Sequence, residues 1–170
     1  MKVLELIGLP VYDIATGKRV SKIKDVWITD DWLMTHVELE EPTRFTRVRH
    51  IIPWHDIKAC GEDAIMIENS LAVREAEAVH IERARAFLTG PERVKDLPVV
   101  TQEGNQLGWV ADVYFQPNLG NTITGLEISD GLLADLLEGR RQLDEANRHM
   151  RLGQDTVVVS DLVNPTGSHL

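Results

Sequence analysis

The chain has 170 residues, of which 43% are hydrophobic and 26% charged, and its net charge is −9. These values are ordinary for a soluble globular protein and argue against a disordered or fibrous chain, while a pI near 5.1 opposes nonspecific attraction to nucleic acid or an anionic membrane. Since no apolar run approaches the roughly 18 residues of a membrane helix and the N-terminus lacks the apolar core of a signal peptide, we expect a cytoplasmic protein without membrane insertion.

The first part of the chain predicts short antiparallel strands. Gly17 supplies the positive φ that a tight hairpin turn needs. The apolar residues that follow it are spaced irregularly enough to predict a bend or bulge within a strand. Pro53 ends a later pairing, because proline cannot donate to a central ladder. The strands expected here cover residues 8–12, 20–28, 34–39, 47–52 and 64–68.

The pattern changes after Ser70. Apolar residues keep a mostly helical spacing among acidic and basic residues as far as Leu88. Ser70 is a suitable N-cap, and Gly90-Pro91 is a stop signal. We therefore expect a helical connector over residues 71–90, with its apolar face packed on one of the flanking units or at a dimer contact.

The last part of the chain again predicts strands, at residues 94–100, 107–115 and 122–129, with a turn at Gly104. A leucine-rich stretch from Leu132 to Leu143 then predicts a helix with one apolar face. Residues 153–159 close the unit with a turn and an aliphatic strand. The polar C-terminal tail is expected to fray.

The two strand-rich parts repeat each other at an offset of 87 positions. A period of this length exceeds the roughly 20 to 50 residues of a solenoid repeat and fits a small complete domain used twice. We expect domains at residues 1–70 and 91–165, the connector at 71–90 and a tail at 166–170. The matching pairs are Gly17 with Gly104, Val20 with Leu107, Ile23 with Val110, Asp25 with Asp112, Val26 with Val113 and Trp27 with Tyr114.

These residues resemble the PRC-barrel family. The resemblance rests on Ser21-Lys22-Ile23-Lys24-Asp25-Val26-Trp27 with Gly61-Glu62-Asp63-Ala64-Ile65, on Gly108-Trp109-Val110-Ala111-Asp112-Val113-Tyr114 with Gly153-Gln154-Asp155-Thr156-Val157, and on Ile51-Ile52-Pro53-Trp54-His55-Asp56-Ile57. It implies a mainly β fold of two small antiparallel β-barrels joined by the helical connector. The family also includes the cytoplasmic domain of the photosynthetic reaction-centre H subunit and the C-terminal domain of the ribosome maturation factor RimM, which dock on larger assemblies.

Catalytic and metal-binding patterns are weak in this sequence. His50, His55 and Asp56 form the tightest cluster, but their spacing places no third metal ligand. Asp25 and Asp112 occupy equivalent positions of separate units, which favours a structural role in accepting backbone N–H groups over acid–base catalysis. No serine lies in a nucleophile elbow, and Cys60, the single cysteine, is expected to be buried and inert. We therefore expect no enzyme, no metal and no cofactor.

Two segments differ between the repeats and are candidates for partner binding. The run from Arg44 to His50 is a local basic patch with an aromatic residue available for stacking, although a solvated strand face also explains it. The leucine-rich stretch could form an interface, although core packing is the default. The candidate partner-binding residues are Arg44, Phe45, Arg47, Arg49, Trp54, Leu132, Leu136 and Arg140.

The sequence as a whole favours a non-catalytic adaptor that docks on a protein or ribonucleoprotein assembly and can also form a homodimer. The alternative is an RNA-associated factor in ribosome maturation or RNA processing, in which Arg44, Arg47 and Arg49 would contact phosphates. An enzyme is the third hypothesis, and it requires a deep polar pocket with clustered His and Asp residues.

Overall fold

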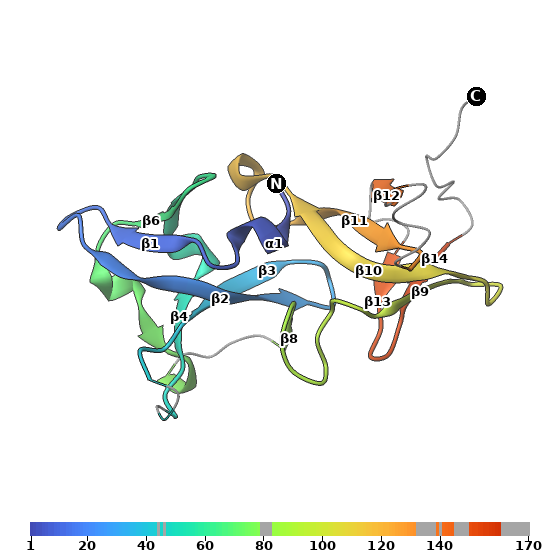
Figure 1. The fold of residues 1–170 in the computed structure, drawn as a ribbon, viewed down its shortest axis with the longest axis horizontal. Coiled ribbons are helices and arrows are strands. Elements are labelled where there is room, and N and C mark those ends of the chain that lie inside the picture. The colour runs from blue at the N-terminus through green and yellow to red at the C-terminus, as the bar shows by residue number, and fades with distance from the viewer. Residues whose placement is uncertain are drawn as a thin grey trace.

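The computed structural model describes residues 1–43, 45, 47–78, 83–131, 139, 141–144 and 150–160. We refer to residues 1–90 as the first half and to residues 91–170 as the second half. Each half contributes one curled sheet (Figure 1). Within the described residues, the first sheet has eight strands and the second has six. The mainly β fold predicted from the sequence is confirmed.

The first sheet is organised by the long strand β2 (Arg19–Thr29), which changes partner along its length. Its beginning pairs with β1, and its later residues pair with β3 on one edge and β8 on the other. Register shifts at Val11/Tyr12, Ile23/Asp25 and Trp27/Ile28 bend the strand, as the irregular spacing of its apolar residues predicts. The other strands are β1 (Pro10–Asp13), β3 (Met34–Leu39), β4 (His50–Pro53), β5 (Ile57–Cys60), β6 (Ile65–Ile67), β7 (Arg74–Glu75) and β8 (Ala84–Ala86).

The second sheet repeats this plan around the long strand β10 (Gln106–Phe115). In each half a long strand pairs antiparallel with the strands before and after it, and the last strand of the repeat returns parallel to the first. Gly17 and Gly104 both have positive φ, 67° and 88°, in their hairpin turns. The other strands are β9 (Pro98–Thr101), β11 (Ile123–Ser129), β12 (Arg141–Asp144), β13 (Met150–Leu152) and β14 (Val157–Val159).

The helical connector is not confirmed. Its described residues form two 3₁₀ turns and two short strands, because β7 finds a partner in β4 and β8 finds one in β2. The leucine-rich helix falls mostly on residues outside the described part, and its end at residues 141–144 is instead strand β12, paired with β11. The described helices are α1 (Val3–Leu6) and the 3₁₀ turns η1 (Trp54–Asp56), η2 (Ser70–Ala72), η3 (Ala76–Ala78) and η4 (Pro117–Leu119). None of these helices is long and apolar enough to cross a membrane.

The buried apolar residues of the two halves form one continuous cluster. The first half inserts Trp32, whose ring is 2% exposed and whose Nε1 donates to the carbonyl of Met150 in the second half at 3.3 Å. Trp54 meets Phe115 of the second half edge-on, at a centroid distance of 5.7 Å. The two curled sheets therefore share a core rather than burying two separate ones.

The contact between the halves has approximate twofold symmetry. Leu33 and Thr122, which occupy matching positions before β3 and β11, form a β-bridge with each other. Contact between equivalent positions is the mark of an isologous interface, normally seen between two identical subunits. Here both sides of that interface belong to one chain.

The segment that leads into each repeat lies on the sheet of the other repeat. Residues before β1 reach the second half, where Lys2 forms a bridge with Tyr114 and the Phe115 amide donates to the Met1 carbonyl. Residues before β9 lie on the first half, where β8 pairs with β2 and the Phe87 amide donates to the Val26 carbonyl. Figure 1 shows α1 beside β10, and β8 on the lower side of β2. The leading segment of each repeat thus completes the other repeat.

Candidate functional site

The predicted partner-binding residues lie in different environments. Phe45 is 95% exposed, and Arg47 is exposed two positions later. Arg49 holds its guanidinium 5.6 Å from the ring centroid of Trp27, a cation–π contact. Trp54 packs on Phe115, so part of its surface serves the contact between the halves. Arg44, Leu132, Leu136 and Arg140 lie outside the described residues.

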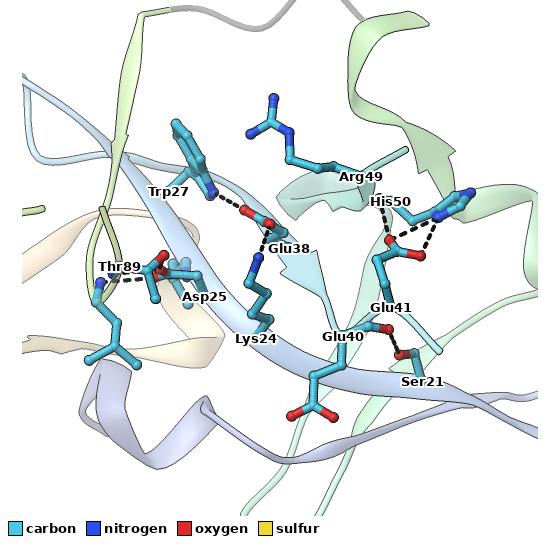
Figure 2. Close-up of polar contacts among 12 residues, drawn as sticks. Ser21, Lys24, Asp25, Trp27, Glu38, Glu40, Glu41, Arg49, His50 and Thr89 are labelled. Atoms are coloured by element: carbon cyan, nitrogen blue, oxygen red, sulfur yellow. Dashed lines mark hydrogen bonds and ion pairs between the residues drawn. The ribbon is translucent and has the colours of Figure 1, made fainter. Parts of the chain in front are cut away.

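The segment that carries Phe45, Arg47 and Arg49 joins β3 to β4, and we call it the basic loop. It begins after Leu39, where Glu40 and Glu41 leave the sheet and Pro42 removes a backbone donor. Glu41 anchors the far end of the loop, because its carboxylate accepts hydrogen bonds from the backbone N–H and the ring Nδ1 of His50 at 2.8 and 2.9 Å (Figure 2). The loop is therefore fixed at both ends, while the Phe45 side chain between them is exposed to solvent.

Beneath the basic loop, β2 and β3 carry a polar cluster around the buried carboxylate of Glu38. One carboxylate oxygen accepts from Trp27 Nε1 at 3.0 Å, and the other contacts Lys24 Nζ at 2.7 Å (Figure 2). Glu38 is only 3% exposed, so these two donors offset the cost of removing its charge from water. They also fix the orientation of the Trp27 ring.

His36 completes this cluster from β3. Its ring stacks on Trp27 at a centroid distance of 5.3 Å, and its Nδ1 lies 2.8 Å from the Thr35 hydroxyl. Burial lowers the pKa of His36 to about 4, while nearby Glu38 acts in the opposite direction. The ring is therefore neutral at pH 7, and Trp27 contacts both this neutral imidazole and the charged guanidinium of Arg49. Arg49 also faces Glu77 at 3.6 Å.

The second half carries a matching cluster around Glu127 of β11. Its carboxylate accepts from the Tyr114 hydroxyl at 3.1 Å and contacts Lys2 Nζ at 3.2 Å. Tyr114 stands where the first half has Trp27, but the lysine now comes from the N-terminus of the chain rather than from the neighbouring strand. Both halves thus contain a buried glutamate that contacts an aromatic donor and a lysine, but the lysine comes from a different part of the chain in each half.

Asp25 and Asp112 have the structural role that their equivalent positions predict. Asp25 accepts hydrogen bonds from the amides of Val26, Leu88 and Thr89 and from the Thr89 hydroxyl. Asp112 accepts from the amides of Leu4 and Val113 with a single oxygen. Each carboxylate therefore holds the leading segment of the other repeat in place.

The two aspartates nevertheless differ in their electrostatic environment. Burial raises the pKa of Asp112 to about 6, although the two amide donors act to lower it. Asp25 is fully buried and has four donors on its two oxygens. The charge of Asp25 is therefore more completely solvated by protein groups than that of Asp112.

The histidine and cysteine candidates lie apart from one another. His50 is engaged by Glu41, and His55 is mostly exposed, with its Nε2 at 3.5 Å from Asp56. Within the described part of the chain, no three His, Cys, Asp or Glu side chains are placed to share a metal ion. Cys60 is half-buried beside the Met1 thioether, and burial raises the pKa of its thiol to about 11.

Sequence reasoning did not identify Trp27, His36 and Glu38 as a cluster. A signal was present, because Glu38 and Glu127 each interrupt an apolar strand at matching positions, Val37-Glu38-Leu39 and Leu126-Glu127-Ile128. A charged residue inside a buried strand is unfavourable without hydrogen-bond partners. The presence of a glutamate at matching positions of both halves therefore indicates that each half provides hydrogen-bond donors for it. Which donors these are depends on strand register and on the distant N-terminus.

Comparisons with known proteins agree with the duplicated architecture. A family model described as PRC-barrel domain matches residues 1–73 and again residues 92–162. A relative from Bacillus subtilis (strain 168), named "Uncharacterized protein YrrD", is 28% identical over 156 residues, which cover 92% of this chain and 85% of that protein.

Proposed function

This chain belongs to the PRC-barrel domain family, and from that premise we propose that it is a non-catalytic cytoplasmic adaptor that docks a protein partner through the basic loop. The observation that carries the proposal is the exposure of Phe45 in a loop anchored at both ends. A large aromatic side chain held 95% in water has no role in the fold, whereas aromatic and arginine side chains are the residue types enriched where proteins bind one another.

The duplicated carboxylates support a non-catalytic role. Asp25 and Asp112 are engaged by backbone amides, and Glu38 and Glu127 are engaged by aromatic donors and lysines. These contacts hold together the sheets and their exchanged segments. The buried acidic residues therefore serve the scaffold that presents the loop.

An RNA-associated role is the second candidate, favoured by the combination of Phe45 with Arg47 and Arg49, since bases stack on aromatic rings and phosphates attract arginines. The charge of Arg49 is already shared with the ring of Trp27 and the carboxylate of Glu77. This sharing, together with a net charge of −9, makes a protein partner the better match for this loop.

Site-specific photo-crosslinking tests the proposal. A photoreactive phenylalanine analogue at position 45 of the full chain should give a discrete cross-linked protein in native extract, unaffected by nuclease. The double variant Arg47→Glu/Arg49→Glu, carrying the same analogue, should lose that product. The matched control places the analogue at Leu119, which is 70% exposed in a loop of the second half. A product destroyed by nuclease would favour the RNA-associated role, and identical products at both positions would contradict specific docking at the basic loop.

A further inference from the structure

A second surface of the first half has the features of a peptide-binding groove. It is an open groove of about 580 Å³ along the beginning of β2, walled by the end of β3, His50 and Val73. This volume lies within the range of small-molecule and peptide sites. The start of the basic loop, Glu40 to Pro42, also lines the groove, whereas Phe45, Arg47 and Arg49 do not.

The groove exists because the first residues of β2 have no paired strand along one of their two edges. Along one edge, β2 pairs with β1 at residues 19–22 and with β8 at residues 27–29. Along the other edge, its pairing with β3 begins at Ile23, opposite Leu39. The Glu40 amide still donates to the Lys22 carbonyl. The Ser21 hydroxyl donates to the Glu40 carbonyl (Figure 2), before the chain continues to Pro42. Residues 19–21 therefore present a strand edge to the groove.

The open edge also contains a β-bulge. The β1–β2 register steps from Val11 opposite Ser21 to Tyr12 opposite Arg19, so Val20 is the extra residue on β2. An extra residue in a bulge is left without a ladder partner on the neighbouring strand. Val20 thus has no register partner on β1 and lines the groove on the side that β3 leaves uncovered. Exposed edges of this kind are where extended peptides add to a sheet.

The lining of the groove indicates which peptide would fit. Val20, Leu39 and Val73 give it an apolar floor. Arg19 and Lys22 stand on the β2 side, and among the described residues neither has a carboxylate within ion-pairing distance. On the opposite side, the charge of Glu41 is engaged by His50, which leaves Glu40 as the remaining acidic group. The β2 side of the groove is therefore locally cationic on an otherwise acidic protein.

From this arrangement we propose that the groove binds an extended acidic segment of a partner protein, which adds as a strand beside Arg19–Lys22 of β2. Its backbone hydrogen-bonds to the open edge at Val20, its apolar side chains cover Val20, Leu39 and Val73, and its carboxylates face Arg19 and Lys22. The proposal rests on the adaptor function proposed above, but it assigns the contact to a different surface and a defined peptide chemistry.

Peptide titration of the full chain tests this. The probe is a fluorescein-labelled heptapeptide of alternating glutamate and valine, followed by fluorescence anisotropy and by the backbone amide NMR signals of the protein. We expect saturable binding, with the largest shifts at Val20, Lys22, Leu39 and Val73. The double variant Arg19→Glu/Lys22→Glu should weaken binding about tenfold, because two surface ion pairs become two like-charge contacts. The matched control Arg83→Glu/Arg151→Glu has the same change in net charge outside the groove and should stay within about twofold of the wild type.

Two further probes separate strand addition from other binding modes. N-methylation of the peptide amides removes main-chain donors without changing charge, and it should abolish binding if the peptide adds as a strand. Absence of saturable binding at millimolar peptide, equal weakening in the control variant, or unchanged binding of the N-methylated peptide would overturn the proposal. So would an oligouridine that competes with equal affinity at the same residues, since that would indicate a nucleic-acid site.

The variant Arg47→Glu/Arg49→Glu distinguishes the two surfaces. It should lose the photo-cross-linked product of the basic loop and keep the peptide affinity of the groove. Loss of cross-linking at position 45 in every condition with intact peptide binding would therefore remove the basic loop as a docking site and leave the groove proposal standing.

Discussion

The two halves of the protein share an order of strands, but the buried carboxylates at matching positions have different hydrogen-bond partners. Asp25 and Asp112 sit at matching bulges, yet Asp25 receives four hydrogen bonds on two oxygens and Asp112 receives two on one. Glu38 takes Lys24 from the neighbouring strand β2, 14 residues away in the sequence, whereas Glu127 takes Lys2 from 125 residues away. The two halves therefore share the positions of the buried acids and differ in the residues that donate to them.

The halves also differ at their surfaces. The first half carries the basic loop, the stacked Trp27 and the open edge of β2, and its β2 also pairs with β8, which belongs to the segment that leads into the second repeat. Among the described residues, the second half receives the short N-terminal segment at the corresponding edge. The proposed adaptor function requires a stable frame and a variable surface. The shared positions would supply the frame, and the divergent ones would supply the contacts.

The largest expected effect on stability comes from the turn between β2 and β3, which packs against the second half through Trp32. Trp32→Ala removes a ring that is 2% exposed and packed in the shared core, and it should lower the free energy of unfolding by about 3–5 kcal/mol. Leu119→Ala, in the corresponding loop of the second half, removes a side chain that is 70% exposed and should change stability by no more than about 0.5 kcal/mol. Urea denaturation measures both. Similar losses of stability in the two variants would contradict the conclusion that Trp32 is packed in the shared core while Leu119 is not.

The same substitution should have different effects on the two matching aspartates. In Asp25, one carboxylate oxygen accepts from the amides of Val26 and Leu88, and the other accepts from Thr89. Asp25→Asn replaces one of these oxygens by an NH₂ group, which cannot accept from those donors, so the free energy of unfolding should fall by about 1–3 kcal/mol. Asp112→Asn keeps an oxygen for Leu4 and Val113 and removes a buried charge, so stability at pH 7 should stay the same or rise. Denaturation of both variants at pH 7 compares them directly, and equal destabilisation would contradict the difference in hydrogen bonding.

The smallest expected effect is a pH dependence of opposite sign in the two halves. The pKa of Asp112 is raised from 3.8 to about 6, so between these values the folded protein keeps a proton that the unfolded chain has lost, and stability falls as the pH rises. The pKa of His36 is lowered from 6.5 to about 4, so the unfolded chain binds a proton that the folded protein does not, and stability rises with pH. The two contributions oppose each other in the wild type.

Single variants should expose each contribution. Between pH 4 and pH 6.5, the free energy of unfolding of Asp112→Asn should rise more steeply with pH than that of the wild type. That of His36→Gln should rise less steeply or fall. Each difference from the wild type should be on the order of 1 kcal/mol over this interval. Urea midpoints measured across this interval give both slopes. Parallel profiles for the two variants would mean that these groups do not control the pH dependence.

Sequence patterns alone were enough to predict the repeat, the mainly β fold, the turns at Gly17 and Gly104 and the structural role of Asp25 and Asp112. These features are local, because strand periodicity, a positive φ and a carboxylate at a bulge are set by residues close together in the chain. Tertiary structure decided the rest. Residues 74–75 and 84–86 became strands because β4 and β2 offered free edges, and such pairing overrides a helical spacing. The contact of Lys2 with Glu127, the shared core around Trp32 and the open edge at Val20 likewise depend on packing between segments far apart in sequence, which no local pattern encodes.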